Sequence, residues 1–225
     1  MHIEPGIVDA AKIGLSWATG AAAFSLLGKT VVDTLKSSNI AAFAARSAAA
    51  TALVFGFFEL LPHAPVGVSE VHLILGTTLF LIFGAGPAAV GLSLGLLVQG
   101  LFFAPFDLPQ YGMNVTTLLL PLFAMAALAK RIIPAGTAYK DLGYGQTLKL
   151  SLAFQGGIVA WVAFWAIYGQ GFGAANLANV ASFGAAYMSV ILLEPLVDLA
   201  VLAVAKLLSR SEGAGLIQAR VYHAA

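Results

Sequence analysis

Long apolar segments, several of them about 20 residues long, run through most of this sequence, and a helix of that length can cross a lipid bilayer. Hydrophobic residues make up 60% of the 225 residues and charged residues only 9%. Soluble domains, in contrast, carry about 25% charged residues. The sequence therefore predicts an all-α membrane protein.

We expect a bundle of about seven transmembrane helices that forms one domain over residues 1–209, followed by a short, polar, unstructured cytoplasmic tail over residues 210–225. The expected spans cover residues 10–27, 40–61, 67–83, 88–106, 113–128, 147–168 and 176–208. The third span is short, and the glycines and proline at 84–87 end it. The last is too long for one perpendicular crossing, so it tilts or extends beyond the membrane, and Pro195 can kink it.

The distribution of basic residues predicts the orientation, because loops on the cytoplasmic side of a membrane protein are enriched in Lys and Arg. An N-terminus outside and a C-terminus in the cytoplasm leave only Lys12 on the outer side. The inner side then receives Lys29, Lys36, Arg46, Lys130, Arg131, Lys140, Lys149, Lys206, Arg210 and Arg220. We therefore expect a multi-pass protein of the plasma membrane.

Several classes of function lack their sequence signatures. The absence of cysteine excludes disulfides, thiolate zinc sites and iron–sulfur clusters. No basic run could follow the phosphate backbone of a nucleic acid. The sequence contains no phosphate-binding loop, no HExxH and no GxSxG motif, so we expect no enzyme, no intrinsic cofactor, and no ATP hydrolysis by this chain. The acidic start predicts no cleavable signal peptide, so Met1 is the expected mature N-terminus.

The first two residues, Met1 and His2, can together chelate a metal ion. The α-amino group, the amide nitrogen of His2 and its imidazole Nδ1 close one five-membered and one six-membered ring. Three nitrogens in one plane favour Ni(II) or Cu(II) over Zn(II). The alternative is that His2 belongs to a disordered terminus and has no role.

The expected topology places two further histidines, His63 and His72, on the outer face with His2, while His223 lies in the inner tail. Either imidazole could complete the metal plane. The same connection carries Glu70, and Glu59 lies just inside the preceding span. The alternatives are that His63 is simply solvated in its loop and that His72 bonds to a neighbouring carbonyl at the interface.

Two polar side chains lie in or beside the apolar spans. Asn114 opens the fifth span, where its side chain can contribute to the site or cap the helix, and capping is slightly favoured. Gln99 lies inside the fourth span, where it can support the site or form an interhelical hydrogen bond of about 1 kcal/mol. The sequence does not separate these alternatives for Gln99.

Two other patterns have both structural and functional interpretations. Glu194 and Asp198 share one helix face and could bind a proton or a cation, but pairing with a basic residue such as Lys206 or with a partner subunit is favoured. Small residues recur at four-residue spacing and suit close helix packing, either within the bundle or against a second membrane protein. These residues are Gly14, Ala18 and Ala22, and Ala41, Ala45 and Ala49.

Taken together, these motifs resemble the CbiM/NikM family, the substrate-capture (S) components of energy-coupling factor transporters for cobalt and nickel. The start at Met1–Gly6 is similar to the family's Met-His-Ile-x-x-Gly. The stretch Val68–Leu73 is similar to its outer loop, which ends in His-Leu. Residues 96–103 resemble its Gln-containing helix, and residues 112–114 its Gly-x-Asn motif. The resemblance covers about residues 1–205.

The resemblance implies a metal bound in a plane by Met1, His2 and one further histidine, His72 or His63, with His72 the first choice. It also implies partners: a transmembrane coupling (T) protein, cytoplasmic ATPases and often a small accessory membrane subunit. The sequence departs from the family at residues 4–5 and carries Glu70 where small residues are common.

The expected function is therefore capture of Co(II) or Ni(II) at the outer face. Binding needs neutral imidazoles, so we expect it to weaken as the pH falls through about 6.5. The alternatives are an S component for a vitamin-like organic ligand, a structural membrane protein, and a metal-dependent intramembrane enzyme that uses Glu59 or Glu70. The sequence does not choose between cobalt and nickel.

Overall fold

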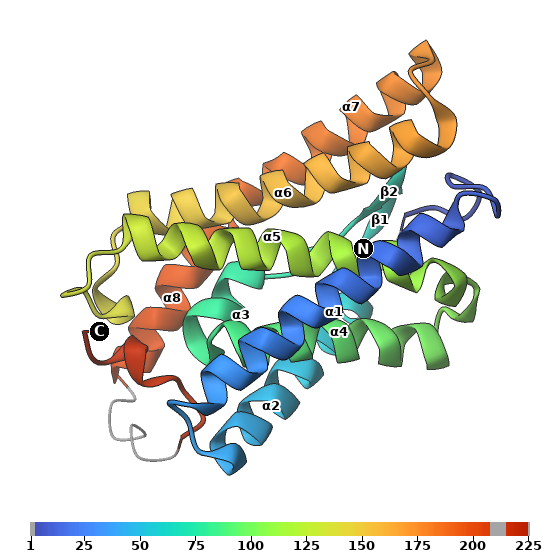
Figure 1. The fold of residues 1–225 in the computed structure, drawn as a ribbon. Helices are drawn as coiled ribbons and strands as arrows, with labels where there is room; N and C mark the ends of the chain where they lie inside the picture. The colour runs from blue at the N-terminus through green and yellow to red at the C-terminus, as the bar shows by residue number, and fades with distance from the viewer. Residues whose placement is uncertain (1–2, 208–214, 225) are drawn as a thin grey trace.

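The computed structural model describes residues 3–207 and 215–224, which form a helical bundle with one small β-hairpin (Figure 1). The α-helices are α1 (Ile13–Leu35), α2 (Ile40–Glu59), α3 (Gly76–Phe83), α4 (Ala85–Phe102), α5 (Tyr111–Ile132), α6 (Tyr144–Gln170), α7 (Ala174–Met188) and α8 (Glu194–Leu207). The hairpin pairs β1 (Ala64–Val66) with β2 (Ser69–Val71). Short 3-10 helices are η1 (Pro105–Gln110), η2 (Tyr139–Asp141), η3 (Ser189–Leu192) and η5 (Ala219–Val221).

Within the described ranges, 5 helical segments are long and apolar enough to cross a membrane, which makes this a multi-pass membrane protein. They are Ile40–Glu59, Ala85–Phe102, Pro105–Ile132, Tyr144–Gln170 and Ala174–Leu207. The expected number of seven is not reproduced. Helix α1 has 23 residues but does not reach the apolarity of these segments, and α3 has only 8 residues.

The expected third span is the clearest departure from the sequence-based fold. Only its last part, α3, is helical, and the residues before it form the β-hairpin and an extended link. Gly67 turns the hairpin with φ 63°, and a Cβ there would lie 2.1 Å from the carbonyl oxygen of Asn179 in α7. Leu75 adopts φ 55° and begins α3, which Gly84 ends with φ 90°. The hairpin therefore replaces the first part of the expected third span, because the chain reverses its direction at Gly67, beside α7.

Helices α2 and α4 pack closely because α4 carries glycines at the contact. A Cβ on Gly91 would lie 2.5 Å from the Cβ of Ala50, and one on Gly95 would lie 2.6 Å from Val54. The closest approach therefore uses these residues of α2 rather than the predicted row that ends at Ala49. The other predicted row, Gly14, Ala18 and Ala22 on α1, is exposed on the outside of the bundle.

The last long helical segment is broken between α7 and α8, with Pro195 in the first turn of α8, where a missing N–H costs nothing. Glu194 is fully buried and accepts hydrogen bonds from Ser151 at 2.6 Å and Gln155 at 2.7 Å. Lys206 lies 3.6 Å from Asp141 instead. Glu194 therefore does not pair with this lysine, and the other favoured interpretation, pairing with a partner subunit, stays a prediction.

The C-terminal tail packs against the bundle, so the expectation of an unstructured tail is wrong for residues 215–224. The side chain of Gln218 donates to the carbonyls of Phe80 at 2.8 Å and Leu81 at 2.6 Å at the end of α3. Val221 is fully buried, and the Tyr222 hydroxyl donates to the carbonyl of Ala205 at 3.1 Å. These apolar and backbone contacts order a segment that appeared polar in the sequence.

The α2–α4 contact predicts that Gly91→Ala lowers stability. The new methyl group would meet both the Cβ and the backbone carbon of Ala50, the latter at 2.8 Å, so the helices must separate. Such overpacking typically costs about 1–3 kcal/mol. Thermal unfolding in detergent measures the loss. Gly156→Ala in α6 is the matched control, since a Cβ there meets nothing within 4 Å. Equal midpoints for the two variants would contradict the packing.

Candidate metal centre

The N-terminal segment enters the bundle and adds to the edge of the β-hairpin. Ile3 forms an antiparallel bridge with Ser69 of β2, and the amide of Glu4 donates to the carbonyl of Val68 at 3.3 Å. Ile3 is only 1% exposed. An isolated pair of strands is marginal, so the added segment and the surrounding helices stabilise the hairpin.

Asn114 holds this segment from the opposite side. Its Oδ1 accepts a hydrogen bond of 3.0 Å from the amide of Ile3, although the two residues are 111 positions apart. The side chain is 1% exposed, and Asn114 is the fourth residue of α5, whose N-cap position is Gln110. The favoured interpretation of Asn114 as a helix cap is therefore wrong. Its side-chain oxygen instead binds the backbone of the N-terminal segment.

The remainder of the segment is attached to the C-terminal end of α6. The carbonyl of Ile7 lies so close to Gly169 that a Cβ there would be 1.9 Å from it. Lys12 donates to the carbonyls of Tyr168 at 3.1 Å and Gly169 at 3.0 Å. A lysine at this end of a helix complements the unpaired carbonyls and the dipole. These contacts hold Lys12, the one basic residue that the expected topology leaves on the outer side, against the end of α6.

His72 follows β2 directly and is buried. Its side chain is 0% exposed, and its Nε2 lies 2.9 Å from Oε2 of Glu70. The ring of Phe58 meets it edge-on, with centroids 5.4 Å apart. The ring of His63 stacks on it at 4.8 Å with an interplanar angle of 12°. His63 is itself exposed, so it covers His72 from the surface.

Gln99 connects helices α4 and α2 through a side-chain hydrogen bond. Its Nε2 donates to Oε1 of Glu59 at 2.8 Å, and so links α4 to the end of α2. Gln99 is 5% exposed. Of the two interpretations left open for Gln99, the structure displays the interhelical hydrogen bond, and its partner is one of the carboxylates singled out in the sequence.

The two predicted ligands Met1 and His2 lie outside the described residues. Within residues 3–207 and 215–224, no group of three or more His, Asp or Glu side chains is arranged to hold a metal ion. The structure does bring together His72, His63 and Glu70, and it places Asn114 against Ile3. Sequence reasoning missed Phe58 and the backbone of residues 68–69, whose roles depend on contacts between distant parts of the chain.

Comparisons with known proteins identify the family and the fold of the chain. A family model described as CbiM, cobalt uptake substrate-specific transmembrane region, matches residues 2–211. A search of curated proteins finds no match. A crystal structure described as a truncated transition metal transporter aligns with a TM-score of 0.68 and 19% identity over 93% of this chain and 99% of that one. A second, described as a transition metal transporter, gives 0.69 and 18% over 93% and 94%. At these identities the likeness shows a shared fold.

The contact between Asn114 and Ile3 predicts that Asn114→Leu releases the N-terminal segment. The buried amide of Ile3 would lose its acceptor, at a cost of about 1–3 kcal/mol. Hydrogen exchange over residues 3–12 should then be roughly tenfold faster or more, while the helices exchange as before. Gln155→Leu is the matched control, because it removes another fully buried amide that makes a long-range hydrogen bond, to Glu194. Unchanged exchange in Asn114→Leu would contradict the anchoring role.

Proposed function

Since the chain belongs to the family of cobalt uptake substrate-specific transmembrane regions, we propose that it is the substrate-capture component of an energy-coupling factor importer for Co(II) or Ni(II). Family membership makes it a membrane component of metal uptake. The proposed capture site is the end of the bundle where the N-terminal segment meets the β-hairpin. The metal is the cargo of this site.

The burial of Ile3 beside the hairpin is the observation that carries the proposal. Ile3 is fixed by Asn114 and by its bridge to Ser69. Consecutive Cα atoms are about 3.8 Å apart, so a chelate built from the amine of Met1 and the amide and imidazole of His2 would lie within roughly 8 Å of the Cα of Ile3. The hairpin strand that Ile3 meets leads directly into His72. An antiparallel approach along β2 would bring the chelate toward that imidazole.

We assign His72 as the further histidine ligand and His63 as its cover. The His72 ring is buried, and the contact with Glu70 fixes its orientation, as carboxylates do for metal-binding imidazoles. His63 stacks on that ring from the exposed side. Nitrogen ligands in a plane suit Ni(II) and also Co(II) once the amide of His2 is deprotonated.

A membrane partner and ATPases would supply the energy for release. The exposed row of Gly14, Ala18 and Ala22 on α1 offers close helix packing to a transmembrane coupling protein. An accessory membrane subunit and cytoplasmic ATPases would complete the importer.

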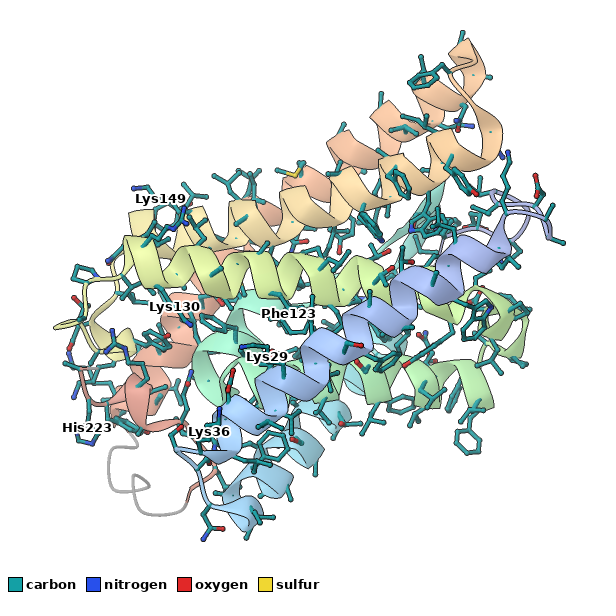
Figure 2. The ribbon with its side chains drawn as sticks, viewed as in Figure 1. Lys29, Lys36, Phe123, Lys130, Lys149 and His223 are labelled. Carbon is teal, nitrogen blue, oxygen red and sulfur yellow. The ribbon has the colours of Figure 1, made fainter. Side chains whose placement is uncertain are left out.

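Basic residues from three helices support the orientation. Lys29 near the end of α1, Lys36 directly after it, Lys130 on α5 and Lys149 on α6 lie toward one end of the bundle (Figure 2), while Lys12 contacts the opposite end of α6. By the positive-inside rule, we propose that the first end faces the cytoplasm and that the capture site faces outside.

Three added glycines before Met1 test the chelate. This extension moves the α-amino group away from the amide of His2 and places the histidine fifth, too far along for a terminal amine–imidazole chelate, so we expect Ni(II) affinity, measured by calorimetry on the purified protein, to fall by at least about 100-fold, more than the loss of an outer-shell partner. Three glycines added after Ala225 are the control. Undiminished affinity in the N-terminal extension would exclude the amine chelate, and no metal binding by the natural chain would favour an organic ligand or a structural role.

Single histidine variants separate the two candidate ligands. We expect His72→Ala to lose Ni(II) binding as severely as the extension does, because the buried imidazole is the proposed ligand. His63→Ala should keep most of the affinity and bind faster, since it removes only the ring that covers the site. The reverse result would assign the metal to His63.

A further inference from the structure

A cleft of about 1130 Å³ opens at the end of the bundle away from the N-terminal segment. It lies between the C-terminal halves of α1 and α5. Its other walls are the start of α2, the α3–α4 junction and residues 215–220. Helices α1 and α5 touch at Gly20 and Gly112, where a Cβ on Gly20 would be 3.3 Å from the Cα of Gly112. From that crossing α1 and α5 diverge toward their C-terminal ends (Figure 1). The residues that line the cleft come from these diverging halves.

The polar part of the cleft is cationic. Lys29, Arg46, Lys130 and Arg220 line it, against the single carboxylate of Asp33. Asp33 pairs with Lys29 at 2.8 Å. Within the described part of the chain, the other three cations form no ion pair with a carboxylate. The lining therefore holds an excess of positive charge that no described residue neutralises.

The most buried of these cations is built into the wall. Arg46 is only 6% exposed, and its guanidinium donates to the carbonyl of Phe83 at 3.3 Å and to the hydroxyl of Ser38. Arg220 donates to the carbonyls of Ala135 at 2.9 Å and Pro134 at 3.1 Å and lies over the ring of Tyr139. Neutral groups thus hold both side chains in place, and these partners do not neutralise the positive charges.

The other part of the cleft is apolar and reaches into the bundle. Phe80, Phe83 and Ile133 form its buried wall, and half-buried Phe123 faces α1 from α5. Figure 2 shows Phe123 and Lys29 on the two sides of the gap between these helices. Lys130 lies further along α5, toward the end of the bundle that carries Lys149. Cations at the mouth and aromatic rings deeper in the membrane make one amphipathic site.

We propose that this cleft binds an anionic phospholipid, with its phosphate at Lys130, Arg46 and Arg220 and an acyl chain along Phe80, Phe83 and Phe123. Basic pockets between transmembrane helices on the cytoplasmic side suit anionic head groups. Guanidinium groups suit phosphate oxygens in particular. The site lies where the spanning helix α5 ends and α2 begins, which is the level of the head groups.

Charge complementarity favours a lipid over the other occupants. A free phosphate would satisfy the cations but leave the aromatic wall unused. A helix from a partner subunit would cover that wall but would need carboxylates to match the unpaired cations. The inner leaflet supplies both an anionic group and an apolar chain in one molecule. The proposal uses the cytoplasmic orientation given above and is independent of the metal carried.

Native mass spectrometry of the delipidated full chain tests the head group. Titrated with dioleoyl phosphatidylglycerol or dioleoyl phosphatidylcholine, the natural chain should retain the anionic lipid at about a tenfold lower concentration. Lys130→Glu should abolish this preference, and Lys149→Glu, which reverses an exposed lysine of α6 outside the cleft, should retain it. Nickel binding by Lys130→Glu should be unchanged, so failure of this proposal is distinct from failure of the metal site.

A second pair of variants tests the apolar part. Ala127→Trp fills the cleft and should displace the lipid, whereas Ala124→Trp, on the same helix but outside the lining, should not. Equal retention of the two lipids, equal effects of Lys130→Glu and Lys149→Glu, or unchanged retention in Ala127→Trp would each overturn the proposal. Competition by glycerophosphate, which has no acyl chain, at the same concentration as the lipid would show a simple anion site instead. Cross-linking of position 127 to a partner subunit without lipid preference would assign the cleft to that subunit.

Discussion

The hydrogen bond from the amide of Ile3 to Asn114 is the contact on which one end of the bundle depends. A buried amide without an acceptor costs about 1–3 kcal/mol, so the chain enters between α5 and the hairpin only because Asn114 provides the acceptor. The bridge to Ser69 fixes the direction of entry, and the close contact of Gly67 with α7 fixes the hairpin. One amide side chain in a membrane helix thereby determines where the first residues of the chain can act.

The same helix connects the two ends of the molecule. Gly112, two residues before Asn114, is the point at which α1 touches α5, and a Cβ there would lie 2.5 Å from the carbonyl oxygen of Ser16. Beyond this crossing the two helices separate and enclose the cationic cleft. The proposed metal site, through Asn114, and the proposed lipid site, through Phe123 and Lys130, therefore both contact α5. A movement of α5 against α1 would change both sites, which is the physical basis on which a partner protein at the exposed face of α1 could act.

The long helices were predictable because apolar length alone specifies them. The ends of α2, α4, α5 and α6 fall within a few residues of the predicted spans, and the break near Pro195 follows from the geometry of proline. The third span failed because its apolar run is shared between a strand and a helix, which composition does not distinguish. The reversal at Gly67 and the left-handed Leu75 become evident only against α7 and α6.

Contacts between distant positions set the limit of prediction at the site. The sequence singled out His63 and His72, and their rings stack at 4.8 Å. It favoured Asn114 as a cap because local capping is the common role of asparagine at a helix start, whereas the observed partner is 111 residues away. The tail was misjudged for the same reason, since Gln218 contacts carbonyls at Phe80 and Leu81 that no local pattern reveals.

X-ray absorption spectroscopy of the nickel-loaded chain tests the central claim most directly. If Met1, His2 and His72 form the plane, the edge should show a square-planar ion, and the first shell should hold nitrogen alone with scattering from two imidazole rings. The signal of one ring should disappear in His72→Ala. A six-coordinate shell dominated by oxygen, or an unchanged imidazole signal in His72→Ala, would contradict a site formed by the anchored N-terminal segment and that histidine.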